Sequence, residues 1–123
     1  MKFHPDASHA QSIKAYGPGW VQVGNERLVS SVVITSRGER FPWHCARFED
    51  LSLAHFEQLA NLQTELVIFG SGNRLRFPPA ALTQALIERQ IGIETMDTQA
   101  ACRTYSVLAN EGRTVAVALL LES

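Results

Sequence analysis

The residues best suited to chemistry in this chain surround a short glycine loop. The apolar run 66–69 leads directly into Gly70, Ser71 and Gly72. An apolar run that ends in a turn predicts a strand buried on both faces, and glycine allows the backbone to turn sharply at the carboxyl end of that strand. Open α/β sheets bind their ligands at this edge. The loop is therefore where a binding site is first expected.

Two arginines follow the loop and could form an anion pocket. Arg74 and Arg76 alternate with Leu75 and Phe77, so in an extended segment the apolar pair is expected to point inward and the guanidinium groups outward. A helix that starts near residue 98 would add backbone donors. The residues predicted to bind an anion or another small ligand are Gly70, Ser71, Gly72, Arg74, Arg76, Thr98 and Arg103. A plain solvated loop is the alternative, and it is slightly favoured.

Two familiar glycine-loop chemistries do not fit this segment. A dinucleotide-binding fingerprint would need glycine where Leu75 stands, and Pro78 and Pro79 remove backbone donors where a phosphate would bind. Only Glu94 matches the fingerprint, because it lies at the end of the following strand, where a ribose-binding carboxylate would stand. Ser71 has neither the spacing nor the following helix of a nucleophile elbow. The loop therefore favours a structural turn or a simple ligand contact over catalysis.

Cysteine and histidine also lack a catalytic or metal-binding arrangement. His44 and Cys45 are neighbours, so in an extended chain their side chains point to opposite faces. The four histidines show no ligand spacing. Cys45 and Cys102 are too few and too far apart for a disulfide framework or a zinc site, and they suit a reducing compartment as free thiols. We therefore expect no catalytic residues, no metal and no cofactor.

Composition narrows the class of protein further. At 123 residues and 46% hydrophobic, the chain is long enough to bury a core as one globular domain. A net charge of −1 gives no electrostatic reason to expect nucleic acid or an anionic membrane as a partner. No apolar run approaches the roughly 20 residues of a membrane-spanning helix, and residues 1–11 resemble neither a signal peptide nor a mitochondrial presequence. The expected location is the cytoplasm.

The hydrophobic pattern predicts a flexible tail over residues 1–12 and a single α/β domain over residues 13–123. Short β-branched and aromatic runs separated by glycine turns predict an antiparallel meander, with strands at 13–16, 20–23 and 26–34. Asp50 or Ser52 is expected to cap a helix that follows.

Strands and helices alternate in the second half of the chain. The expected order is strand 66–69, a helix that begins at Pro79, a short strand at Ile93, a helix capped by Asp97 or Thr98, and strand 114–121. Strands separated by helices pair in parallel through right-handed crossovers. The side chains predicted to form the core include Leu66, Ile68, Leu86, Tyr105, Val117 and Leu119.

Several motifs, in this order along the chain, carry a family resemblance: 66–72, 77–79, 92–98, 100–105 and 111–113. Together they resemble a family of small α/β proteins that includes many bacterial and archaeal members, a mitochondrial assembly factor for respiratory complex I and an adipogenesis-associated human protein. Ser106 departs from this pattern, because many members have asparagine there. The resemblance implies a three-layer β/β/α domain in which the N-terminal antiparallel strands pack on a short, mainly parallel sheet.

The resemblance brings no catalytic residues and implies a cytoplasmic bacterial protein that binds another protein, as assembly factors do. The alternative is a small-molecule or anion-binding protein, which could be an enzyme, that uses the segment 70–76 and Arg103. A protein-binding domain is expected to expose an apolar or aromatic patch, whereas a ligand-binding protein is expected to have a closed pocket at the sheet edge. The sequence names neither the partner nor the oligomeric state.

Overall fold

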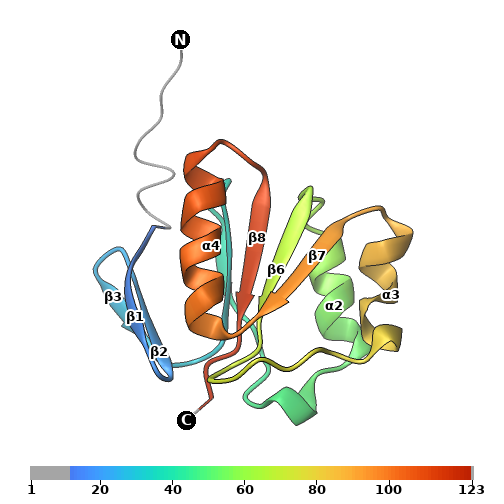
Figure 1. Cartoon of the computed structure of the whole chain (residues 1–123), viewed down its shortest axis with the longest axis horizontal. Helices are drawn as coiled ribbons and strands as arrows, with labels where there is room; N and C mark the ends of the chain where they lie inside the picture. Colours follow the sequence, from blue (N-terminus) through green and yellow to red (C-terminus); the bar gives the residue numbers. More distant parts are fainter. Residues whose placement is uncertain (1–11, 123) are drawn as a thin grey trace.

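The computed structural model describes residues 12–122 (Figure 1). The predicted tail therefore lies outside the described residues, apart from Ser12. The first three strands, β1 (Ile13–Gly17), β2 (Trp20–Val23) and β3 (Glu26–Leu28), form a small antiparallel sheet in the order β1-β2-β3. Gly24 adopts a φ of +57° in the turn between β2 and β3, a conformation that glycine tolerates best. These three strands confirm the first part of the predicted antiparallel meander.

The larger sheet has five strands in the order β5-β4-β8-β6-β7. Its strands are β4 (Val32–Thr35), β5 (Arg40–Pro42), β6 (Leu66–Gly70), β7 (Gly92–Met96) and β8 (Val115–Leu119). β6 runs parallel to both β7 and β8, whereas β4 runs antiparallel to β8 and to β5. The predicted α/β class is confirmed: β6, β7 and β8 form the parallel part of the sheet, and β4 is the strand that runs against its neighbours.

The predicted strand 26–34 is two strands that belong to different sheets. β3 ends at Leu28, and β4 begins at Val32. Between them Val29 is 65% exposed, while the Ser31 carbonyl accepts a hydrogen bond from the Trp43 N–H at 2.9 Å. Val29 within the break is β-branched like Val32, Val33 and Ile34 after it, so β-propensity extends the strand back across the break, and Ser30 and Ser31 are the only local turn residues between them.

The helices cover both faces of the larger sheet (Figure 1). The long helix α4 (Thr98–Asn110) packs on β6 and β8 and contacts β1 of the small sheet. On the other face lie α2 (Leu53–Ala60) and α3 (Ala80–Glu88), which pack against each other, and a short 3₁₀ turn, η1 (Phe48–Asp50), precedes α2. The expected caps are present: the Asp97 carboxylate accepts from the Ala100 N–H at 2.9 Å, and the Ser52 N–H donates to His55 Nδ1 at 3.0 Å.

Two apolar clusters lie on the two faces of the larger sheet. The first joins the small sheet and α4 to β4, β6 and β8, and the second joins α2 and α3 to the opposite face. Of the predicted core residues, five are buried (Ile68, Leu86, Tyr105, Val117 and Leu119), whereas Leu66 at the start of β6 is half-buried. The sheet therefore forms a rigid base from which its carboxyl-edge loops project.

Candidate functional site

The glycine loop is closed on itself by the hydroxyl of Ser71. This residue is fully buried. Its Oγ donates to the Arg74 carbonyl at 2.7 Å and accepts from the Arg76 N–H at 2.9 Å. Its own N–H donates to the Met96 carbonyl at 2.9 Å. These bonds use the donors and acceptors of the serine for the turn itself, so the hydroxyl is not exposed as a nucleophile or a ligand contact.

Gly72 and Thr98 lock the loop to the start of α4. The Gly72 N–H donates to Thr98 Oγ1 at 2.8 Å, and the Thr98 hydroxyl donates in turn to the Leu120 carbonyl at 2.9 Å. The Thr98 N–H donates to the Gly72 carbonyl at 2.8 Å. The first N–H of α4 therefore binds the loop, which leaves it unavailable to an anion.

Both glycines are required where they stand. Gly72 has a φ of +101°, and a Cβ there would lie 2.6 Å from an Arg76 guanidinium nitrogen. A Cβ on Gly70 would lie 3.1 Å from the Cβ of Ala101 and from the Cα of Thr98. The first glycine thus lets α4 approach the sheet closely, and the second allows the left-handed turn.

Arg76 points inward, which corrects the orientation predicted for this segment. Its guanidinium donates to the Ser71 carbonyl at 2.7 Å, pairs with the Glu122 carboxylate at 2.5 Å and lies 4.6 Å from the centre of the Phe48 ring. The side chains of Arg76 and Glu122 are only 17% and 20% exposed. The other Glu122 oxygen accepts from the Phe48 N–H at 2.8 Å. A carboxylate, a carbonyl and an aromatic ring thus compensate for the burial of the charge.

The apolar pair of the same segment points outward instead. Leu75 is 53% exposed and Phe77 is 69% exposed. Arg74 is exposed as predicted, so the segment does not alternate: of these four residues only Arg76 points inward. Arg76 turns inward because the Glu122 carboxylate and the Ser71 carbonyl lie there, and this leaves Leu75 and Phe77, on either side of it, exposed.

The remaining arginines of the predicted set do not join Arg76. Arg74 is exposed, and its side chain has no hydrogen bond or ion pair with any described residue. Arg103 is exposed on α4, where its guanidinium donates to the Tyr16 hydroxyl at 3.4 Å, a contact that raises the pKa of Arg103. The structure therefore brings together Gly70, Ser71, Gly72, Arg76 and Thr98, and directs Arg103 toward the small sheet.

The surface hollow at this edge is balanced in charge. It has a volume of about 460 Å³ and is lined by Ala46, Arg47, Glu49, Arg76 and Glu122. Each arginine there is paired with a glutamate, since Arg47 lies 3.4 Å from Glu49 and Arg76 pairs with Glu122. A hollow that contains two ion pairs has no net charge to attract an anion. Sequence reasoning missed Glu122, although β8 runs parallel to β6 and so delivers the residues after it to the same edge.

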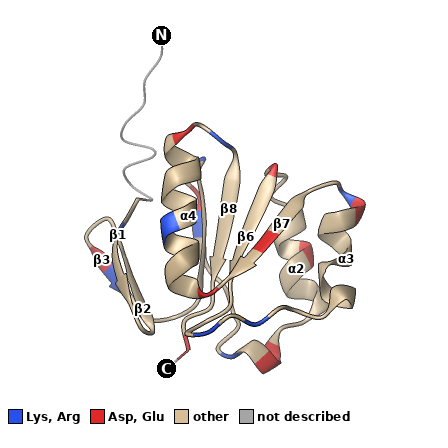
Figure 2. Ribbon diagram, viewed as in Figure 1, with Lys and Arg blue, Asp and Glu red and all other residues tan. Residues whose placement is uncertain are grey.

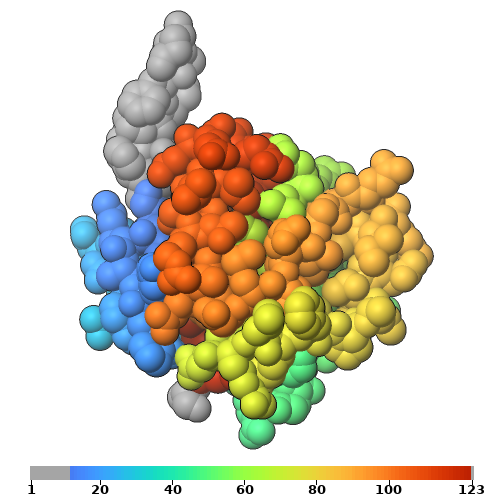
Figure 3. All heavy atoms as spheres, viewed as in Figure 1, coloured from blue at the N-terminus to red at the C-terminus, as the bar shows by residue number. Residues whose placement is uncertain are grey.

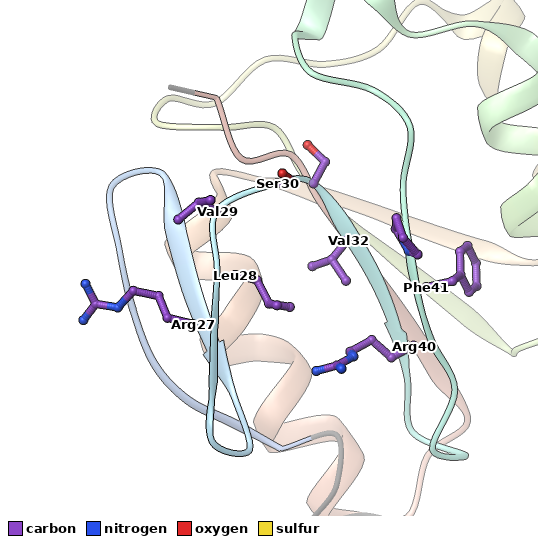
Figure 4. Close-up of a pocket in the computed structure, with 9 residues that line it drawn as sticks. Arg27, Leu28, Val29, Ser30, Val32, Arg40 and Phe41 are labelled. Carbon is purple, nitrogen blue, oxygen red and sulfur yellow. The ribbon is translucent and has the colours of Figure 1, made fainter.

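A second hollow lies between the small sheet and the edge of the larger one (Figure 4). This groove has a volume of about 450 Å³, and Leu28, Val32 and Arg40 project into it in Figure 4. The Arg40 guanidinium is paired with Glu26 at 2.6 Å, and the Arg27 guanidinium lies 3.9 Å from the centre of the Trp20 ring. The arginines of the groove are thus also occupied by neighbouring side chains.

The two thiols are buried and free. Burial raises the pKa of Cys45 to about 11 and that of Cys102 to about 12. Within residues 12–122, no group of three or more His, Cys, Asp or Glu side chains could hold a metal ion. No helix in the same range is long and apolar enough to cross a membrane.

Comparison with known proteins confirms the family resemblance. Residues 13–120 match the family described as "Protein of unknown function (DUF498/DUF598)". An uncharacterized protein of Rhodobacter capsulatus is 33% identical over 116 residues, which cover 94% of this chain and 89% of that protein.

A human relative and a solved structure show the same likeness. Human NADH dehydrogenase (ubiquinone) 1 alpha subcomplex assembly factor 3 is 26% identical over 94% of this chain, which spans 63% of the human protein. The crystal structure of a Bordetella parapertussis protein superposes with a TM-score of 0.84 at 34% identity, covering 89% of this chain and 94% of the other.

Proposed function

The chain belongs to the DUF498/DUF598 family, and from this premise we propose that it is a non-enzymatic, assembly-factor-like protein that acts by binding another protein. The human relative is named as an assembly factor, and the proposal carries that role to this chain. The two buried, free thiols fit a reducing compartment, so the proposed place of action is the cytoplasm.

The observation that carries the proposal is the exposed pair Leu75 and Phe77. An aromatic and an aliphatic side chain at such exposure are suited to anchor a protein interface. Figure 3 shows the segment after β6, coloured yellow, on the surface between α4 and α3. We call this exposed pair, Leu75 and Phe77, the apolar ridge.

The apolar ridge is held rigidly from beneath. Ser71 and Arg76 bond the segment to β7 and to Glu122, so its backbone is ordered before any partner arrives. Binding by a pre-ordered segment avoids much of the entropy cost of association. Order on the inner side and apolar exposure on the outer side together support recognition of a protein.

The anion alternative has weaker support. Any anion at the predicted site would have to displace Glu122 from Arg76 or compete with the internal bonds of Thr98. The adjoining hollow carries paired charges. These contacts favour a structural role for the polar residues of the set.

The test is co-purification of the tagged full-length chain from the cells that produce it naturally. The double variant Leu75→Ser/Phe77→Ser removes the apolar ridge, and Val107→Ser removes an equally exposed apolar side chain from α4. We expect the same protein to be recovered with the wild type and with Val107→Ser, and to be lost from the double variant while its melting temperature is retained. Recovery of that protein with the double variant, or no enrichment over the tag alone, would contradict the proposal.

A further inference from the structure

The edge of the larger sheet at β7 carries unpaired backbone groups. Among residues 12–122, β7 is the terminal strand of its sheet and pairs with β6 alone (Figure 1). The Gly92 N–H donates to the Glu65 carbonyl, and the Met96 carbonyl accepts from the Ser71 N–H. β7 pairs with β6 in a parallel register that sets Glu94 opposite Ile68. In such a register alternate residues bond to the neighbouring strand, so Gly92, Glu94 and Met96 direct their backbone N–H and carbonyl groups toward β6.

The residues between them therefore direct their backbone groups to the open side of β7. These are Ile93 and Thr95, and neither their N–H groups nor their carbonyls hydrogen-bond to any other residue in the described range 12–122. An edge of this kind is a ready template for an added strand.

The opposite edge of the same sheet is protected. On either side of β5, the N–H of Trp43 donates to the Ser31 carbonyl and the Glu39 carbonyl accepts from the Thr35 N–H, so the residues of β5 whose backbone groups face outward are Arg40 and Pro42. Pro42 has no N–H, which is a common way to block an edge. β7 contains no proline and no lysine. The difference marks β7 as the edge that is left able to pair.

Glu94 places a negative charge in the middle of this open edge. Its side chain is exposed and has no ion pair or hydrogen bond with the described residues, and Figure 2 shows this acidic position in the middle of β7. A second copy could use both outward residues only in the antiparallel register that sets Ile93 opposite Thr95. That register also sets Glu94 opposite Glu94, and like charges directly opposite each other are destabilising.

We propose that β7 accepts an extended segment of a partner protein as an added strand, with a Lys or Arg of that segment opposite Glu94. The hydrogen bonds come from Ile93 and Thr95, and the charge of Glu94 selects a basic strand over a second copy of the chain. This inference rests on the proposed protein-binding function, and it adds the conformation and charge of the partner segment.

The experiment uses purified full-length chains only, so its outcome is independent of the co-purification test. Wild-type chain is mixed with the Glu94→Lys chain, which serves as a strand of known structure with a basic residue in the required position. Dimers are measured by sedimentation equilibrium and native mass spectrometry. We expect the mixed dimer to be about fivefold or more abundant than either homodimer, and added salt to weaken it.

A pair of variants tests the backbone contact. Thr95→Pro removes an outward N–H and leaves the ladder to β6 intact, whereas Thr95→Val keeps that N–H. Introduced in both chains, Thr95→Pro should abolish the mixed dimer and Thr95→Val should keep it. In case Thr95→Pro weakens the fold, hydrogen exchange in the Thr95→Val chains gives a second measurement: the amides of residues 93 and 95 should exchange fast alone and slow on mixing.

Three results would overturn the inference. The first is the absence of a mixed dimer at ~1 mM protein, which would mean that the dissociation constant is weaker than about 1 mM, or about 4 kcal/mol of binding free energy. The second is a mixed dimer that folded Thr95→Pro chains still form, or one that forms without slowing exchange at residues 93 and 95. The third is a wild-type homodimer as abundant as the mixed one.

Discussion

The inner and outer sides of the segment that follows β6 have opposite chemistry. On the inner side, the buried groups of Ser71 and Arg76 bond to neighbouring backbone and to Glu122. On the outer side, Leu75 and Phe77 are more than half exposed. Most surface loops show the reverse arrangement, with apolar side chains facing in and charged ones facing out.

The residues that build the edge are therefore different from those available for recognition. A partly buried guanidinium is stable only when its hydrogen bonds are satisfied, and here Ser71, Glu122 and Phe48 satisfy it. The polar residues predicted to bind a ligand, Ser71, Arg76 and Thr98, instead bond within the protein and hold the segment in place. What remains free for a partner on this segment is the apolar ridge together with the exposed Arg74.

The largest effect is expected beneath both sides, in the strand that supports them. Ile68 is fully buried in β6. Ile68→Ala should lower the free energy of unfolding by about 2–5 kcal/mol, through lost transfer free energy and a residual cavity. Urea denaturation measures this value. An unchanged stability would mean that β6 does not anchor the edge.

A smaller loss is expected when the inner side is opened. Glu122→Ala leaves the guanidinium of Arg76 without its carboxylate and should lower the free energy of unfolding by about 1–3 kcal/mol, because the pair is mostly buried. Glu65→Ala is the matched control, since the pair of Glu65 with Arg113 is about half exposed and should matter little. Equal losses from the two variants would remove the distinction between inner and outer contacts.

The thiols report whether the inner side is closed. Cys45 donates its S–H to the Arg47 carbonyl at 3.1 Å, and burial raises its pKa to about 11 from 9.0. At pH 8 the folded chain should therefore react slowly with a thiol reagent, and both thiols should react at once after denaturation. Because unfolding returns the pKa to its lower value, this thiol should favour unfolding increasingly as the pH rises from 9 toward 11.

The same reagent can compare variants. Glu122→Ala should increase the rate at Cys45, since Glu122 helps to hold the surrounding segment. If Cys45 of the folded wild-type chain reacted as fast as a small thiol free in solution, the inner side would be open.

No effect is expected from simple anions. Arg76 is paired with Glu122 and the neighbouring hollow is neutral, so ~10 mM phosphate or sulfate should not raise the melting temperature beyond a chloride control of equal ionic strength. Arg74→Ala/Arg76→Ala should melt earlier in every salt because it loses the ion pair. A rise with phosphate that this double variant abolishes would instead favour the anion site.

The sequence predicts those elements that depend on local pattern. The apolar run 66–69 predicts β6, and the place of Asp97 before a helical pattern predicts that it caps α4. The spacing of apolar residues predicts most of the core, including Ile68, Tyr105 and Leu119. The break between β3 and β4 is missed because Val29 inside it is β-branched like the strand that follows, and β5 is missed because it is only three residues long.

The facing of Arg76 could not be predicted for a different reason. Alternation along a strand gives two possible sides, and hydropathy chooses the apolar residues for the inner one. The choice made by the molecule depends on Glu122, which is 46 residues away in sequence. Only the pairing of β8 with β6 brings that carboxylate to the edge, so the orientation is a property of the tertiary structure.

The most direct test of the account is photo-crosslinking in cells, with a photoreactive amino acid at position 77 or, as a control, at position 87 on α3, where Ile87 is also more than half exposed. We predict a discrete crosslinked protein at position 77, absent at position 87, and lost from position 77 when Leu75→Ser is added. Identical crosslinks at both positions, or none at position 77 in a folded chain, would contradict the claim that the apolar ridge is the surface that binds a partner.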